Sequence, residues 1–186
     1  ESIDIQNSTY DDSTRTMSAF GEATWSVFDN IDLLLGGRVE SEHRRRVGGT
    51  APLLDIDFDE TYNVFLPKAG VAWHVTDAAT VGAVVSRGFN GGGAGVSFEA
   101  PFVAYTYDPE YVWNYEAYAR AELLDRRLSL TGNVFFADYK DLQLPFNLSA
   151  LSTVIRNANR AITYGAEVGA KWIAVPGLTL SGDVGL

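Results

Sequence analysis

The sequence contains no cysteine and only two histidines, His43 and His74, in 186 residues. Without cysteine the chain can form no disulfide and offers no thiolate to a metal ion. Two histidines leave little for a histidine-based site, so we expect no metal and no cofactor. Basic charge is also scarce, because 14 Lys and Arg against 24 Asp and Glu give a net charge of -10. Nucleic-acid-binding surfaces are basic, so this balance argues against a nucleic-acid partner.

Long hydrophobic runs are missing too. No stretch approaches the ~20 consecutive apolar residues that a membrane-spanning helix needs, and the mean hydropathy is -0.03. This does not exclude a membrane, because a barrel strand alternates lipid-facing and lumen-facing residues and its mean hydropathy stays near zero. Residues 1–10 lack the basic start and apolar run of a signal peptide. An exported protein would therefore be mature or truncated here.

The chain alternates apolar and polar residues with a period of two, which indicates strands with one apolar face. Near the end, for example, Leu178, Leu180 and Val184 alternate with polar residues. Helical periodicity is hard to find. The pattern predicts eight strands, at about 17–28, 33–43, 62–75, 80–88, 114–123, 128–139, 161–173 and 178–186.

The predicted connections alternate between short and long. We expect short turns near 29–32, 76–79, 124–127 and 174–177, and long loops near 44–61, 89–113 and 140–160. Outer-membrane barrels have short periplasmic turns and long outer loops, whereas a propeller would need four strands per repeat. The whole chain, 1–186, is therefore predicted to be one all-β domain, an antiparallel up-and-down meander that forms part of a larger transmembrane barrel.

Three tryptophans occupy nearly the same height on successive strands. Trp25, Trp73 and Trp172 lie four or five residues before a predicted turn, each on the apolar face of its strand. A membrane–water interface selects such a ring, because indole has an apolar body and one hydrogen-bond donor. Ordinary core packing is the alternative, but it requires no common height.

Four passages, in order between about residues 60 and 186, resemble motifs of the TonB-dependent outer-membrane receptors. Phe65–Trp73 resembles the family's F-x-P-K-x-G-x-x-W/Y strand, and Ser86–Asn90 resembles its S-R-G-F-R-P-G-G passage. Asp108–Glu116 is similar to P-E-x-x-x-N-Y-E, and Asn157–Glu167 is similar to N-A-G-x-A-x-x-x-G-x-E. The matching residues are Pro67, Lys68, Arg87, Gly88, Pro109, Glu110, Asn114, Glu116, Asn157, Gly165 and Glu167.

The resemblance implies a receptor for a siderophore or other large nutrient in the bacterial outer membrane, energised by TonB. It also implies that these eight strands belong to a barrel of 22, so that the chain is a fragment. Its partners would be outer-membrane lipid, the remaining barrel strands, a plug domain, the TonB complex through a missing N-terminal region, and an extracellular small-molecule ligand. The residues Ala117–Arg120 and Asn90-Gly91 depart from the family pattern, so no subfamily is assigned.

Two groups of loop residues are candidates for ligand contact. Arg44, Arg45 and Arg46 form a run of cations that could attract an anionic chelate or lipopolysaccharide phosphate; the alternative is a solvated basic loop. Tyr105, Tyr107 and Trp113 belong to an aromatic run that could stack on a ligand, with an upper interfacial girdle as the alternative.

Catalytic signals are weak. Asp55, Asp57 and Asp59 alternate as metal ligands do, but the segment lacks the Gly and terminal Glu of a calcium loop. Gly91–Gly95 lacks the Lys-Ser/Thr of a phosphate-binding loop. With no triad or carboxylate pair, we expect no enzyme. The remaining alternatives are a small structural outer-membrane barrel and a soluble β-sandwich that binds carbohydrate.

Overall fold

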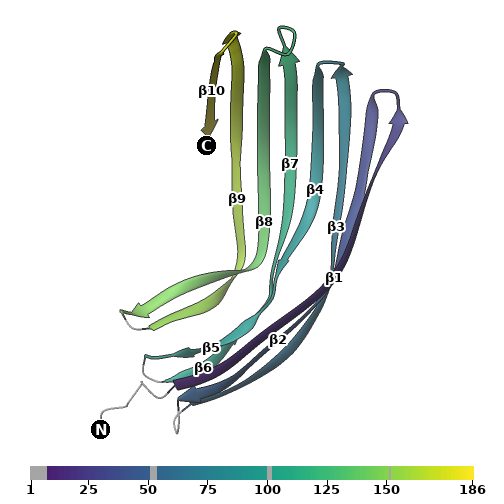
Figure 1. Ribbon diagram of the computed structural model, residues 1–186. Helices are drawn as coiled ribbons and strands as arrows, with labels where there is room; N and C mark the ends of the chain where they lie inside the picture. Colours follow the sequence, from purple (N-terminus) through teal and green to yellow (C-terminus); the bar gives the residue numbers. More distant parts are fainter. Residues whose placement is uncertain (1–7, 51–53, 100–101, 151) are drawn as a thin grey trace.

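A computed structural model describes residues 8–50, 54–99, 102–150 and 152–186, and these residues form strands and their connections (Figure 1). Eight strands make one sheet in the order β1-β2-β3-β4-β7-β8-β9-β10, and β5 and β6 make a separate two-stranded sheet. The strands are β1 Ser8–Phe28, β2 Ile31–Thr50, β3 Leu54–Thr76, β4 Ala79–Asn90, β5 Gly93–Ser97, β6 Val103–Tyr107, β7 Glu110–Leu123, β8 Leu128–Ser149, β9 Ser152–Val175 and β10 Leu178–Gly185.

The large sheet is an antiparallel meander, as the sequence predicts, since each strand pairs with its neighbours in chain order once the β5–β6 hairpin is set aside. The short turns gather at one end of the sheet, at the top of Figure 1. Leu124, Asp125 and Arg126 have φ angles of 55°, 55° and 63°, and Gly177 has a φ of 87°. The left-handed backbone therefore turns the chain tightly at β7–β8 and β9–β10.

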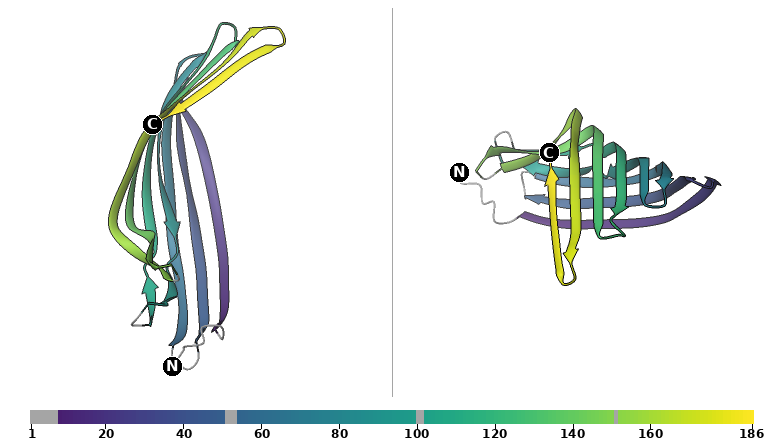
Figure 2. Two further views of the ribbon diagram at one scale, coloured as in Figure 1. Left: turned by 90° about the vertical axis from the view of Figure 1, so that its left-hand side faces the viewer. Right: turned by 90° about the horizontal axis from the view of Figure 1, so that it is seen from above.

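The sheet is curved and open, with β1 and β10 at opposite edges (Figure 2). Its apolar face is not covered by a second layer of described strands, and Trp25 and Phe65 on that face are 68% and 57% exposed. A β-sandwich buries one face of each sheet against the other. The described arrangement therefore does not support the sandwich alternative.

The predicted long loops at 44–61 and 140–160 are wrong in extent, because most of these residues are strand. β2 and β3 stay paired from Ile31↔Trp73 to Thr50↔Leu54, and β8 and β9 stay paired out to Ser149↔Ser152. Apolar alternation in fact continues into both segments, at Leu54, Ile56 and Phe58 and again from Leu142 to Leu148, although charged residues interrupt it. It is absent from residues 44–49, which are mostly arginine and glycine, yet β2 stays paired there.

The third predicted loop, 89–113, contains the β5–β6 hairpin. β3 and β4 pair from Thr76↔Ala79 only as far as Lys68↔Ser86, while β4 and β7 pair on to Asn90↔Glu110. From Leu54 to Pro67, β3 therefore runs apart from β4. The hairpin packs on this part of β1–β3, on the face that carries Ile56 and Phe58. Ile56 and Phe58 of β3 bury against Ala94 and Val96 of β5.

Side chains of a strand point alternately to two faces of the sheet, and the register shows which residues of neighbouring strands share a face, because directly paired residues do so. The pairs Lys68↔Ser86, Ser86↔Asn114 and Asn114↔Ala137 lie on the face that carries the hairpin. This face, called the inner face below, holds most of the charged side chains. The opposite, outer face holds most of the aliphatic residues. Within the described residues, no helix has the length and apolar character to cross a membrane.

Candidate functional site

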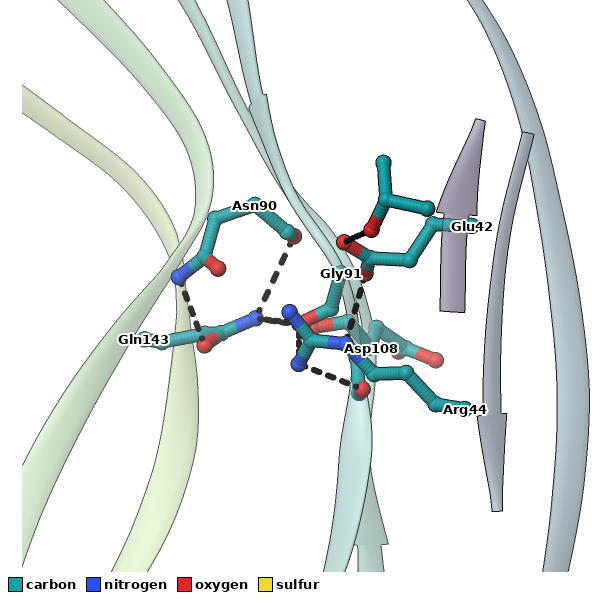
Figure 3. A network of polar contacts seen from close by, with 8 residues as sticks. Glu42, Arg44, Asn90, Gly91, Asp108 and Gln143 are labelled. Carbon is teal, nitrogen blue, oxygen red and sulfur yellow. Dashed lines mark hydrogen bonds and ion pairs between the residues drawn. The ribbon is translucent and has the colours of Figure 1, made fainter. Parts of the chain in front are cut away.

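The root of the β5–β6 hairpin is clamped from two sides by side chains of distant strands (Figure 3). From β2, Arg44 Nη1 donates to the carbonyl oxygens of Gly91 and Gly92 at 2.9 and 3.1 Å. The same guanidinium donates through Nε to Glu42 at 2.6 Å, and Thr16 also donates to that carboxylate, at 3.4 Å. Glu42 thus holds Arg44 in the orientation that reaches the hairpin.

Gln143 of β8 clamps the same root from the other side. Its Nε2 donates to the carbonyl oxygens of Gly91 and Asp108 at 2.9 and 3.1 Å, and its Oε1 accepts from Asn90 Nδ2 at 3.1 Å. The backbone N–H of Gln143 donates to Glu110 at 2.8 Å. These bonds tie the hairpin root to β8.

Backbone approach requires glycine at Gly92 of this root, and the clamp side chains lie close against Gly91. A Cβ on Gly91 would overlap the Glu42 carboxylate, and a Cβ on Gly92 would overlap the carbonyl oxygen of Tyr107. Close backbone approach therefore explains part of the glycine run that resembles a phosphate loop in sequence.

A cavity of about 700 Å³ lies between the hairpin and the outer part of β8–β9. Tyr105 lines it, and its hydroxyl accepts a hydrogen bond from the Ile155 backbone N–H at 3.0 Å. Asn157 also lines it and bonds the backbone of Asp108 in both directions, as acceptor at 2.8 Å and donor at 2.9 Å. Arg156 is the only cation of the lining, and its side chain is exposed. The cavity thus offers one aromatic ring, one guanidinium, amides and carboxylates.

The three arginines expected to act together are divided by strand alternation. Arg44 and Arg46 project to the inner face, where they line a smaller cavity of about 160 Å³ with Tyr107. Arg46 contacts Asp12 at 3.4 Å and lies 4.7 Å from the Tyr10 ring centroid. Arg45 belongs to the outer face and approaches Asp11 and Asp59 at 3.6 and 4.0 Å. All three guanidinium groups therefore have carboxylate partners on the protein.

The aromatic candidates are divided as well. Tyr105 and Tyr107 lie in β6, directly opposite Gly95 and Gly93, so that each ring covers a glycine across the hairpin. Trp113 lies instead on the outer face of β7, with the Arg87 guanidinium 6.0 Å from its ring centroid. The structure thus brings the two tyrosines together and places Trp113 away from both cavities.

The family-motif residues fall mainly on the inner face and at the hairpin root. Lys68, which follows Pro67, bonds Glu22 at 2.8 Å across β2. Glu116 and Glu167 line an inner-wall cavity of about 560 Å³, together with Arg120. The remaining motif positions lie in β4, namely Arg87 and Gly88; immediately before β7, namely Pro109; in β7, namely Glu110 and Asn114; and in β9, namely Asn157 and Gly165.

Four described side chains have shifted pKa values, and one of them, Arg160, has its pKa raised by its hydrogen bonds to Asp138. At the short-turn end, hydrogen bonds from His74 and Ser26 lower the pKa of Asp32. On the outer face, the paired hydrogen bonds of Arg160, both 2.8 Å, lower the pKa of Asp138. Burial raises the pKa of Tyr62, whose ring lies 5.9 Å from that of Phe89 where the sheet divides. No group of three or more metal-ligating side chains is found among the described residues.

The tryptophans expected to form a girdle all lie on the outer face, with exposures of 68% for Trp25, 48% for Trp73 and 43% for Trp172. Trp25 is in register with Leu33 and then with Val71, so Trp73 lies 73 - 71 = 2 residues nearer the turns, two strands away.

The same offset continues along the sheet. The row of directly paired residues that starts at Trp73 continues through Val81, Ala119, Gly132 and Val168. Trp172 then lies 172 - 168 = 4 residues nearer the turns, four strands away. The three residues therefore shift by one residue per strand, in a constant direction.

Sequence reasoning missed Gln143, Asn90 and Glu42 as members of the hairpin clamp. They are separated by up to 101 residues (143 - 42). Gln143 and Glu42 stand in no motif, and Asn90 is a position where the Ser86–Asn90 passage departs from the family pattern. Alternation could have placed Glu42 beside Arg44 on one face, but the position of Gln143 follows only from the folded hairpin.

Comparison with known proteins gives one consistent answer. The family model described as "TonB dependent receptor-like, beta-barrel" matches residues 2–185. The pesticin receptor of Yersinia pestis is 28% identical over 170 residues, which cover 87% of this chain and 24% of that protein. The chain thus spans about a quarter of the length of the curated relatives it matches.

Solved structures have the same strand arrangement. The ferric yersiniabactin uptake receptor of Yersinia pestis superposes with a TM-score of 0.75 at 24% identity, covering 96% of this chain and 27% of that one. The ferripyoverdine receptor of Pseudomonas aeruginosa gives 0.69 at 23% identity, covering 95% and 23%. At these identities the structures show the fold alone. Because the family model spans nearly all of its residues, this chain belongs to the β-barrel of the TonB-dependent receptors, which are proteins of the Gram-negative outer membrane.

Proposed function

We propose that this chain is part of the wall of an outer-membrane receptor that imports a metal-bound siderophore with energy from the TonB complex. The family supports a receptor and not an enzyme. Two similar structures carry the words ferric yersiniabactin and ferripyoverdine in their titles, which supports iron chelates as the ligand class.

The cavity between the hairpin and β8–β9 is the observation that carries the proposal. Its volume, about 700 Å³, lies within the range of about 300–1,000 Å³ that is common for small-molecule sites. It lies at the end of the sheet opposite the short turns, which is the outer end in this architecture. A chelate arriving from outside would meet Tyr105, Arg156 and Asn157 before the inner wall.

The structure ranks the expected ligand residues. We propose that Tyr105 contacts the ligand directly, by stacking or through its hydroxyl. We propose that Arg44 and Arg46 contribute by holding the hairpin, because carbonyl and carboxylate oxygens already bind their guanidinium groups. Tyr107 holds the hairpin too, since its ring covers Gly93. Arg45 and Trp113 project to the outer face and are not proposed as ligand contacts.

The tryptophan offsets support a membrane girdle. A shift of one residue per strand is about 3.3 Å along a strand for every ~4.8 Å across it, a slope of about 35°. Barrel strands tilt by about 35–45°, so the same three residues would then lie at one depth. On β1 and β3 the outer face turns polar at Arg15 and Asn63, ten residues from Trp25 and Trp73. Ten residues at that tilt span about 27 Å, close to the ~25 Å apolar band of such barrels.

The rest of the receptor supplies the other partners. The edges of β1 and β10 would pair with further strands of the same barrel, because an unpaired strand edge does not persist in lipid. The inner wall around Glu116, Arg120 and Glu167 would face a plug domain. TonB would act through a region outside these residues.

Iron uptake by cells tests the proposal. Cells that express the full-length receptor should accumulate ⁵⁵Fe from ferric yersiniabactin or ferripyoverdine, and deletion of TonB should abolish this accumulation. Arg156→Ala should weaken binding of the accepted chelate about tenfold, the loss typical of one charged hydrogen bond. Arg45→Ala is the matched control and should bind normally. If neither chelate enters above the level of receptor-free cells, the iron-chelate proposal fails.

A further inference from the structure

The outer face of β4–β9 carries a group of cations where its apolar band ends. We call this surface the outer cation patch and define it as Arg87, Tyr111, Trp113, Lys140 and Arg160. Register places them together, since Arg87 pairs with Trp113, and Tyr111 pairs with Lys140, which pairs with Arg160. The patch lies at the end of the sheet opposite the short turns and faces away from both hairpin cavities.

Arg87 is held in place but is not neutralised. Its guanidinium carbon lies 4.6 Å from the centroid of the Tyr111 ring and 6.0 Å from that of Trp113, within cation–π range. Its Nε is buried and has no hydrogen-bond partner among the described residues. Within those residues Arg87 also has no carboxylate partner. Two aromatic rings therefore fix a cation whose charge the described part of the protein leaves unpaired.

The other two cations each have a carboxylate partner on the protein. Asp138 forms a two-fold hydrogen-bonded pair with Arg160 at 2.8 Å. The Lys140 side chain is 78% exposed and approaches Asp141 at 3.9 Å. Three cations against these two carboxylates leave a local charge of +1, in a chain whose net charge is -10. The patch is a positive surface on an acidic protein.

We propose that the outer cation patch binds a phosphate group of the phosphorylated glycolipid in the outer leaflet of the outer membrane. The aromatic rings would lie among the acyl chains near the interface, and the guanidinium and ammonium groups would reach the headgroups above them. Arginine and lysine both bind phosphate, and a lipid phosphate would supply the charge that Arg87 lacks. The sequence alone suggested lipid phosphate for Arg44–Arg46, but Arg44 and Arg46 face inward.

The outer face of β1–β3 provides the contrast. Arg45 projects outward there too, but Asp11 and Asp59 approach it at 3.6 and 4.0 Å. Its charge is balanced by the protein itself. Arg45 is therefore a matched control for an arginine on the same outer face without a phosphate partner.

Lipid retention by the purified full-length receptor tests this site. Diphosphoryl lipid A is added to the receptor in detergent, and bound lipid is counted by native mass spectrometry, with dephosphorylated lipid A as the comparison probe. Arg87→Gln should lower the affinity for diphosphoryl lipid A about fivefold, which corresponds to ~1 kcal/mol per cation at a lipid surface. Lys140→Gln should also lower it, and Arg45→Gln should not.

Two further measurements keep the test decisive. If Arg87→Gln does not fold, as judged by heat-dependent gel mobility, Lys140→Gln decides, because its side chain is exposed. Binding by the unmodified receptor should also weaken between 50 and 500 mM salt, since salt screens an exposed charge pair. Equal binding of the two lipid A forms, or unchanged affinity in Lys140→Gln, would overturn the proposal. The proposal would also be overturned if the receptor bound inorganic phosphate and diphosphoryl lipid A failed to displace it.

Discussion

Arg44 joins two distant segments of the chain through one guanidinium group, since it bonds Glu42 of its own strand and two carbonyls of the hairpin root. Arg45, one residue later, points to the opposite face. Alternation along β2 thus gives two adjacent arginines different roles. This difference allows a test in which residue type, strand and depth are all matched.

Arg44→Ala should loosen the β5–β6 hairpin, and Arg45→Ala should not. Hydrogen bonds to charged groups contribute about 1.5–3 kcal/mol, and the lower value corresponds to a tenfold change in an opening equilibrium. We expect amide hydrogen exchange in the hairpin to be about tenfold faster in Arg44→Ala, measured by mass spectrometry on the full-length receptor. Equal exchange in the two variants would show that Gln143 alone holds the root.

The Asp32 site predicts a dependence on acid. The hydrogen bonds from His74 and Ser26 lower the pKa of Asp32 in the folded state. Because the folded pKa is the lower one, this stabilisation is present above the unfolded value of about 3.9 and is lost as pH falls through the folded pKa. Thermal unfolding followed by circular dichroism should therefore separate Asp32→Asn from the unmodified receptor at pH 7 and 5. The two curves should converge as the pH falls below the unfolded value and through the lowered folded pKa of Asp32.

Asp77→Asn, in the neighbouring turn, serves as the control for this acid effect. It should not reproduce the convergence, because the effect belongs to the His74–Asp32 contact at 2.9 Å. A difference between Asp32→Asn and the unmodified receptor that does not shrink as the pH is lowered below the unfolded pKa of about 3.9 would contradict the assignment.

At the scale of elements, apolar alternation marks the strands both within the apolar band and beyond it. Leu128, Leu130, Val134 and Phe136 mark β8 by their alternation, and Leu142, Leu144, Phe146 and Leu148 continue it. Because Lys140 and Asp141 interrupt the apolar pattern, the predicted strand ends at 139 although the alternation resumes at Leu142. The family motifs correctly led from β3 to β9. The inward fold of β5–β6 was not predictable, because it depends on Gln143 and Arg44 meeting at Gly91 from strands far apart in sequence.

The hairpin should be separable from the barrel wall. β5 and β6 pair only with each other, so replacing residues 93–107 by a short Gly-Ser linker removes no strand pair of the large sheet. We expect the full-length variant to remain folded by heat-dependent gel mobility and to lose accumulation of the chelate that the unmodified receptor accepts. Retained accumulation would show that the ligand does not depend on the cavity beside Tyr105.

At the scale of the whole molecule, the tryptophan offsets make a prediction about membrane depth. If the strands ran along the membrane normal, Trp73 would lie two residues, or ~7 Å, nearer the turns than Trp25, and Trp172 a further ~13 Å nearer. In a barrel whose strands tilt by about 35° from the membrane normal, each row of directly paired residues slopes through the membrane, and this slope cancels the offsets. The three indoles should then lie at one depth, and Trp113 should lie near the opposite interface.

Fluorescence quenching by lipids labelled at known depths distinguishes these geometries. Four variants of the full-length receptor would each retain one of Trp25, Trp73, Trp113 and Trp172, with the other tryptophans of the protein replaced by Phe. The first, second and fourth should give depths within a few ångströms of one another, and Trp113 should be quenched best by labels near the other leaflet. Depths that descend in steps of ~7 and ~13 Å would contradict the strand tilt, and with it the proposed tryptophan girdle. Because the tilt follows from register alone, the measurement would test the barrel geometry of this chain without knowledge of its ligand.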